Sequence, residues 1–174
     1  RPEFFQFTKR LHNLIHGSGE PTISSAEREV YEQVSRENAK EFGGLVGPRD
    51  VVVIHDPQPL GMMRFMGRPQ NGCAIWRCHI GLDRRIPQTR AAWEFLQPYA
   101  EIYDGAVFSA PEYIPGFLGG KSTIIHPALD PLSHKNRALS VHKLAGVLCN
   151  AGLMPCSEPV LTPAFQHRVE RLMP

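Results

Sequence analysis

Three side chains suited to hydrogen-bonding a polyol follow the first apolar β-type segment of the chain. This segment, residues 50–54, is followed by His55, Asp56 and Gln58, which alternate with two prolines. Because the prolines restrict the backbone, the turn holds an imidazole, a carboxylate and an amide in fixed positions. We predict that these three residues bind sugar hydroxyls. The alternative is that Asp56 caps the next helix and His55 packs in the core.

The next apolar segment, residues 73–78, brings an arginine and a histidine to its end. Arg77 and His79 are two positions apart, so in an extended strand they point to the same side. A guanidinium stabilises the charge that develops on a departing phosphate, and an imidazole hydrogen-bonds a sugar. We predict Arg77 and His79 as catalytic residues. The alternative for Arg77 is a structural ion pair with Asp83 or Asp104.

A third polar group lies in residues 130–136, after the last predicted strand. We predict that Asp130 orients this turn, and that Lys135 or Asn136 either contacts a ligand or caps a helix. A purely structural turn is the alternative.

Metal and nucleotide motifs are missing from the sequence. His12 and His16 are one helical turn apart, but HNLIH lacks the glutamate of a zinc protease, and the four cysteines form no C-x-x-C pair. We therefore predict no metal site, and expect reduced thiols. His12 is expected to face the substrate cleft, and His16 to lie near the helix C-terminus. Neither a G-x-G-x-x-G sequence nor a Walker A motif is present, which disfavours a complete dinucleotide dehydrogenase.

Helices and strands alternate along the chain. The patterns predict helices over 4–15, 27–41, 89–99 and 137–148, a looser helix over 58–66, and strands over 50–54, 73–78, 103–108 and 122–126. This alternation favours a Rossmann-like, doubly wound, mainly parallel α/β sheet, with strand 50–54 buried on both faces. Ligands bind beyond the carboxyl ends of such strands, which selects 55–56, 79 onward, 109–113 and 126–130.

Composition excludes several classes of protein. The chain has 174 residues, of which 42% are hydrophobic and 21% charged, as in globular proteins. The net charge of +2 is too small to indicate a nucleic-acid partner. No apolar run reaches the roughly 20 residues that span a membrane, and no signal peptide is recognisable. Four scattered cysteines are typical of reduced thiols in a cytosolic protein, so we expect a cytoplasmic location. The first residue is arginine, which suggests part of a longer protein.

Several segments together resemble one family. They are FFQFTKRLHNLIHG (4–17), VVVIHDPQPLG (51–61), WRCHIGLD (76–83), YDGAVFSAPEYIP (103–115) and HPALDPLSHKN (126–136). In this order they resemble the N-terminal domain of glycosyltransferring trehalose synthases, which are retaining GT-B glycosyltransferases related to trehalose phosphorylases. The sequence departs from the family at Gly81, where the family has the aspartate of WRCHID, and at LIHG (14–17), where it has LQG.

The resemblance implies transfer of glucose from a nucleoside-diphosphate-glucose to glucose, giving trehalose with retention and without a metal or other cofactor. His79 would then hydrogen-bond the transferred sugar, Arg77 would line the cleft, and His55, Asp56 and Gln58 would bind the acceptor. The chain would be an incomplete acceptor-side domain without its first strand and C-terminal donor domain, and inactive alone. Its exposed inter-domain face is expected to support self-association as a homodimer. The alternatives are a stand-alone sugar-binding or phosphorylase-like module, or a flavodoxin-like fold.

Overall fold

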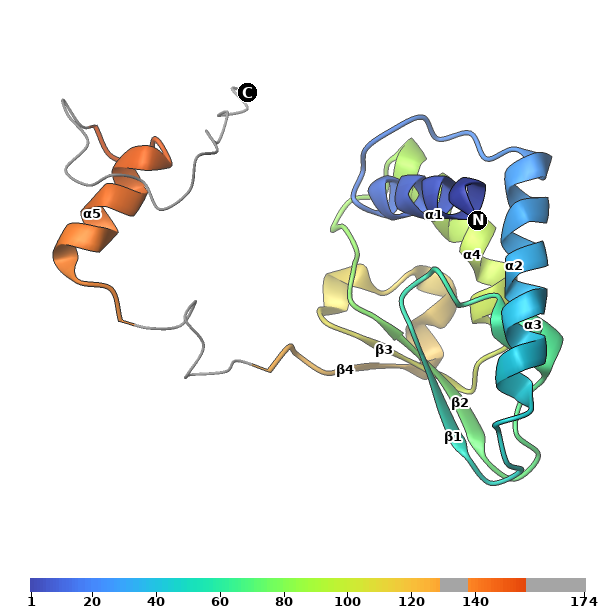
Figure 1. Ribbon diagram of the computed structural model, residues 1–174. Coiled ribbons are helices and arrows are strands. Elements are labelled where there is room, and N and C mark those ends of the chain that lie inside the picture. Colours follow the sequence, from blue (N-terminus) through green and yellow to red (C-terminus); the bar gives the residue numbers. More distant parts are fainter. Residues whose placement is uncertain (129–137, 156–174) are drawn as a thin grey trace. The chain divides into compact units, whose positions relative to one another are not determined.

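The computed structural model describes residues 1–128 and 138–155. The chain divides into two compact units, Arg1–Pro127 and Ala128–Pro174, which are considered separately. The first unit holds a sheet and its helices (Figure 1). In the second, helix α5 (Val141–Asn150) begins after Ser140, whose Oγ accepts the Lys143 N–H at 3.4 Å. The predicted helix at 137–148 is confirmed, with its start moved to residue 141.

The sheet has four parallel strands in the order β1-β2-β3-β4. They are β1 (Val51–His55), β2 (Cys73–Cys78), β3 (Gly105–Phe108) and β4 (Ser122–Ile124). Each coincides with a predicted strand to within two residues at either end, and the predicted Rossmann-like α/β class is confirmed. The strands follow one another across the sheet in chain order, so the described strands correspond to one half of a doubly wound sheet. His55 lies opposite Arg77 in the register.

Helices precede β1 and fill the crossovers. They are α1 (Pro2–Ile15), α2 (Ser25–Gly43), α3 (Met62–Met66) and α4 (Pro87–Ala100), with short 3-10 helices η1 (Pro111–Tyr113) and η2 (Gly116–Lys121) before β4. A capping box starts α2: Ser24 Oγ accepts the Glu27 N–H at 3.2 Å, and Glu27 accepts the Ser24 N–H at 2.9 Å. Gly17, with φ of 83°, follows α1 as a helix terminator.

The two faces of the sheet differ. Even-numbered strand residues such as Ile54 and Trp76 are buried with the apolar sides of α1, α2 and α4, which Figure 1 shows gathered on one side of the strands. On the other face, Val51 and Val53 are 64% and 47% exposed. The prediction that this strand is buried on both faces is therefore wrong. A run of β-branched residues does not reveal whether helices cover one face or two.

Two further findings concern membrane-spanning helices and the state of the cysteines. No helix in the described ranges, 1–128 and 138–155, is both long and apolar enough to cross a lipid bilayer. Cys73 and Cys78 are free thiols, but Cys149 is disulfide-bonded, which contradicts the prediction of reduced cysteines throughout.

Candidate functional site

Two histidines meet at the carboxyl edge of the sheet. Nδ1 of His55, the last residue of β1, lies 3.3 Å from Nε2 of His79, which follows β2. The rings stack with centroids 5.5 Å apart and planes inclined by 16°. One imidazole donates and the other accepts, and both residues are exposed. The structure thus brings together these two predicted site residues, and His55 does not pack in the core.

Asp56 connects the ends of β1 and β2. Its N–H donates to Arg77 O at 2.8 Å, and its carboxylate accepts the His79 N–H at 3.1 Å. The Trp76 indole N–H donates to Asp56 O at 3.0 Å. The backbone of Asp56 has φ of 61°, a left-handed conformation that aspartate tolerates better than most residues. The carboxylate therefore orients the histidine loop and does not cap α3, which begins after Gly61 without a side-chain cap.

Two buried tyrosines support the turn after β1. The Tyr31 hydroxyl donates to Pro57 O at 2.8 Å and accepts the Gly61 N–H at 3.0 Å. The Tyr103 hydroxyl donates to Leu60 O at 2.7 Å. Burial raises the pKa of Tyr103, which keeps its hydroxyl protonated as a donor. The turn that carries half-buried Gln58 is thus held from the core side.

Arg77 crosses the ends of the neighbouring strands. Its Nη2 donates to Ile125 O at 2.8 Å and lies 3.5 Å from Ser109 Oγ. Its Nη1 is buried without a hydrogen-bond partner among the described residues. The proposed ion pair with Asp104 is wrong, because that carboxylate pairs with Arg68 and accepts the Ala74 N–H at 2.8 Å. Arg77 therefore connects the end of β2 to the residues that follow β3 and β4.

Two further polar residues, Ser109 and His126, lie at this edge. His126 Nδ1 donates to Ser109 O at 3.1 Å, so the residues after β3 and β4 are joined to each other as well as to Arg77. Neither was singled out by residue type, although both fall in the strand-end segments that the sheet rule selects.

The remaining predicted residues are not part of this group. His12, on the last turn of α1, contacts His16 with ring centroids 4.6 Å apart, and the structure gives it no contact with His55 or His79. Burial and the charge of His12 lower the pKa of His16. Asp130, Lys135 and Asn136 lie outside the described residues. Within the described ranges, no three His, Cys, Asp or Glu side chains gather as a metal site would require.

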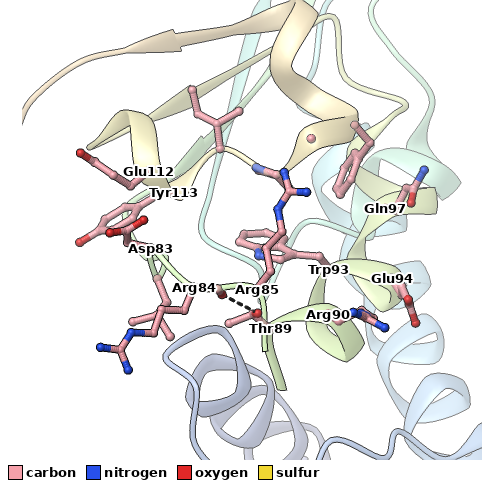
Figure 2. Close-up of a pocket in the computed structure, with 15 residues that line it drawn as sticks. Asp83, Arg84, Arg85, Thr89, Arg90, Trp93, Glu94, Gln97, Glu112 and Tyr113 are labelled. Atoms are coloured by element: carbon pink, nitrogen blue, oxygen red, sulfur yellow. Dashed lines mark hydrogen bonds between the residues drawn. The ribbon is translucent and has the colours of Figure 1, made fainter. Parts of the chain in front are cut away.

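A separate pocket of about 620 Å³ opens beside α4, between the β2–α4 loop and the η1–η2 segment (Figure 2). Charged and aromatic side chains dominate its lining. The strand-end rule selected segments on two of its sides, 79 onward and 109–113, but no lining residue was singled out as a site residue. The lining residues are Leu82, Asp83, Arg84, Arg85, Thr89, Arg90, Trp93, Glu94, Gln97, Glu112, Tyr113, Ile114, Pro115, Gly116 and Phe117. His55, Asp56, Arg77 and His79 are not among them. The pocket and the histidine pair are joined through the loop that starts at His79.

The histidine pair has a definite chemical capacity. Imidazole nitrogens at an exposed edge donate to or accept from hydroxyls, and the Asp56 carboxylate fixes the backbone of the loop that carries one of them. An oxocarbenium-like transition state needs such fixed dipoles more than a strong base. The edge is thus suited to hold a hydroxyl-rich substrate.

Comparison with known proteins gives a consistent result. The protein family described as "Trehalose synthase, N-terminal domain" matches residues 1–115. Trehalose synthase from Pyrococcus horikoshii is 35% identical over 161 residues, covering 92% of this chain and 37% of that protein. Trehalose synthase from Rubrobacter xylanophilus is 40% identical over 139 residues, covering 79% of this chain and 32% of that protein. The chain thus spans about a third of the length of these relatives.

Proposed function

The chain belongs to the family of the trehalose synthase N-terminal domain, and from this premise we propose that it is the acceptor half of a retaining glycosyltransferase that forms trehalose. In this proposal a second, donor-binding domain lies in the part of the relatives that the chain does not cover. The substrates are glucose and a nucleoside-diphosphate-glucose. No metal or further cofactor takes part.

The reaction exchanges one bond at the anomeric carbon for another. The bond from C1 of the donor glucose to the diphosphate oxygen breaks, and a bond from C1 to a hydroxyl oxygen of the acceptor glucose forms with retention. The acceptor hydroxyl loses its proton, and the nucleoside diphosphate leaves with the bonding pair. Charge develops on C1 and on the leaving oxygen, so fixed dipoles and donors lower the barrier.

The proposed roles follow the geometry of the sheet edge. His79 hydrogen-bonds the transferred glucose, because Asp56 fixes its backbone and His55 fixes its ring. His55 and Gln58 bind acceptor hydroxyls. Arg77 acts as a positioning residue, since its guanidinium is committed to Ile125 O and the Ser109 side of the sheet. The observation that carries the proposal is the contact between His55 and His79 at the carboxyl edge, in a chain of this family.

The direct test is a trehalose-forming assay on the full-length gene product with a sugar nucleotide and glucose. His79→Ala is expected to lower kcat/KM by about 100-fold or more while its unfolding midpoint is unchanged, since loss of one such stabilising group typically costs about this much. His16→Ala is the matched control, because His16 is also an exposed histidine. Its ring contacts that of His12, and the structure gives it no contact with His55 or His79. Equal activity of His79→Ala and wild type would remove the assigned role.

A second candidate function is supported by the polar edge and pocket of the first unit: a sugar-binding or phosphorylase-like module. Replacing the sugar nucleotide by inorganic phosphate, with trehalose as substrate, separates a phosphorylase from a synthase. The isolated chain is expected to have little or no transferase activity, because closure of two domains completes such sites and excludes water. Full activity of residues 1–174 alone would contradict the half-enzyme proposal.

A further inference from the structure

The pocket beside α4 contains charged side chains of both signs that are not paired with each other. Its lining includes Arg84, Arg85 and Arg90 together with three carboxylates, those of Asp83, Glu94 and Glu112. The ion pairs found in the described part of the chain are Arg1–Glu37, Arg10–Glu27 and Arg68–Asp104, so none involves these six residues. The pocket therefore offers both donors and acceptors to a ligand.

Aromatic side chains supply the rest of the lining. Trp93 is half-buried and meets the core tryptophan Trp76 edge-on, with ring centroids 6.3 Å apart, which holds its indole in place. Tyr113 and Phe117, both half-buried, line the pocket from the η1–η2 segment. In Figure 2, Arg85 lies across the middle of the pocket beside Trp93, whereas Arg84 points to the other side. Arg85 Nη2 would be 3.8 Å from a Cβ at Gly116, so it reaches the η2 side.

The Tyr113 wall depends on a glycine in the loop after His79. A Cβ added at Gly81 would lie 2.3 Å from Cγ of Tyr113 and 2.4 Å from its Cβ, distances that real side chains do not tolerate. The ring of Tyr113 therefore packs directly on the loop backbone. This contact fixes the position of the Tyr113 wall relative to the loop after His79.

We propose that this pocket binds a neutral pyranose sugar, a glucose or a disaccharide of glucose, separately from the His55–His79 pair. Every sugar hydroxyl both donates and accepts, so it uses guanidinium donors and carboxylate acceptors together. The apolar face of a pyranose packs on an aromatic ring such as Trp93. The volume of about 620 Å³ lies within the range of roughly 300–1,000 Å³ typical of small-ligand sites.

Charge balance selects a neutral ligand over a phosphorylated one. The three guanidinium charges are matched by three carboxylates in the same lining, so a phosphate placed there meets repulsion as well as attraction. A hydroxyl group has no net charge and experiences no such conflict. A sugar phosphate is accordingly the ligand that the pocket disfavours.

Binding is measured on the chain of residues 1–174 without any sugar nucleotide. The acceptor site proposed at His55 and Gln58 would also bind glucose, so the pocket is identified by the emission of Trp93 and by variants of its lining, and not by binding alone. The probes are glucose, trehalose and glucose 6-phosphate, followed by calorimetry and by tryptophan emission. Only two tryptophans are present, and Trp76 is fully buried, so a ligand in the pocket changes the emission of Trp93. We expect saturable binding of at least one neutral sugar, and weaker binding of glucose 6-phosphate.

Two variants locate the site. Arg85→Ala is expected to weaken sugar binding at least tenfold, and Arg49→Ala, an exposed arginine outside the pocket, to leave it unchanged. Circular dichroism melting confirms that each variant is folded. Tighter binding of glucose 6-phosphate, equal affinity of Arg85→Ala and wild type, or no saturable binding of either neutral sugar would overturn the proposal.

Discussion

The carboxylate of Asp56 accepts the backbone N–H of His79 at 3.1 Å, while the backbone of Asp56 itself has φ of 61°. A non-glycine residue in the left-handed region costs about 1 kcal/mol, and the surrounding contacts must offset this. Here the Asp56 N–H bonds to Arg77 O and its carbonyl accepts the Trp76 indole N–H. The backbone conformation and the hydrogen bond to His79 therefore belong to one arrangement that joins β1 to β2.

Substitutions at Asp56 separate these two contributions. Asp56→Asn keeps an acceptor oxygen and tolerates positive φ, so we expect a change in unfolding free energy below about 0.5 kcal/mol. Asp56→Ala loses the acceptor and strains the backbone, and we expect a loss of about 1–2 kcal/mol. Asp56→Gly relieves the backbone strain but leaves the His79 N–H without its partner. Urea unfolding of the three variants measures the difference, and equal stability of Asn and Ala would contradict the role of Asp56.

The histidine pair is expected to act unequally on catalysis, if the proposed roles hold. His55→Ala removes an exposed side chain, so we expect stability within about 0.5 kcal/mol of wild type. If His55 binds the acceptor, its loss raises KM for glucose more than it lowers kcat, whereas loss of His79 lowers kcat. Steady-state assays of the full-length gene product, varying one substrate at a time, make this comparison. An identical effect of both variants on kcat would contradict the division of roles.

The meeting of His55 and His79 could be predicted because it depends on short-range rules. Apolar runs mark the strands, parallel strands end at one edge, and polar residues follow those ends. The direction of the Arg77 side chain could not be predicted, since a strand has a neighbour on each side and alternation fixes only the face. The left-handed conformation of Asp56 was hidden as well, because glycine is the usual residue at such positions.

The shape of the pocket and the exposed face of the sheet could not be predicted from the sequence patterns, although the strand-end rule selected two of the segments that line the pocket. Arg85 and Trp93 come from one loop and helix, but the opposite wall, Tyr113 and Phe117, is brought beside them only by the tertiary fold. Val51 and Val53 are residues typical of a buried strand, although they are exposed here. The same residues would be expected whether helices cover one face of the sheet or both. Local sequence propensity therefore predicts neither the position of the opposite pocket wall nor the exposed face of the sheet.

The contact between Gly81 and Tyr113 leads to a prediction about the loop after His79. Gly81→Ala places a methyl group within 2.3 Å of the Tyr113 ring carbon, so the loop or the tyrosine must move. We expect a loss of stability of about 1–3 kcal/mol, as for other overpacked positions. Gly119→Ala is the matched control, because a Cβ there meets nothing within 4 Å. The double variant Gly81→Ala with Tyr113→Gly removes both the ring and the Cβ that the methyl group meets, so it is expected to recover part of the loss, and no recovery would show that the clash lies elsewhere.

Cys73 and Cys78, the thiols that are free in the described part of the chain, are expected to differ strongly in reactivity. Burial raises the pKa of Cys78 to about 12, and its Sγ donates to Ile80 O at 3.3 Å, so very little thiolate forms at neutral pH. Cys73 is half-buried. Iodoacetamide treatment of the folded chain, read by peptide mass spectrometry, should label Cys73 well before Cys78. Labelling of both at one rate would indicate that β2 opens readily.

Acid is expected to weaken the connection between α1 and α2. Arg10 Nε donates to Glu27 Oε1 at 3.0 Å, and Arg10 Nη1 donates to the carbonyls of Glu20 and Thr22, each at 3.0 Å. Burial alone raises the pKa of Glu27, but the hydrogen bonds from Arg10 and from Ser24 outweigh it and the net pKa is lowered. A carboxyl with a lowered folded-state pKa stabilises the fold above its unfolded pKa. This stabilisation is lost as the pH falls through the lower, folded-state value.

Glu27→Gln tests this link between charge and stability. At pH 7 we expect a loss of about 0.5–1 kcal/mol, since the pair is partly solvent-exposed and screened. As the pH falls through the lowered folded-state pKa of Glu27, wild type and variant should converge, because the wild-type carboxyl then becomes neutral. Glu29→Gln, an exposed neighbour on α2 without an ion pair in the described part of the chain, is the control. Urea unfolding from pH 3 to pH 7 provides the comparison; a difference independent of pH would mean that Glu27 acts through packing.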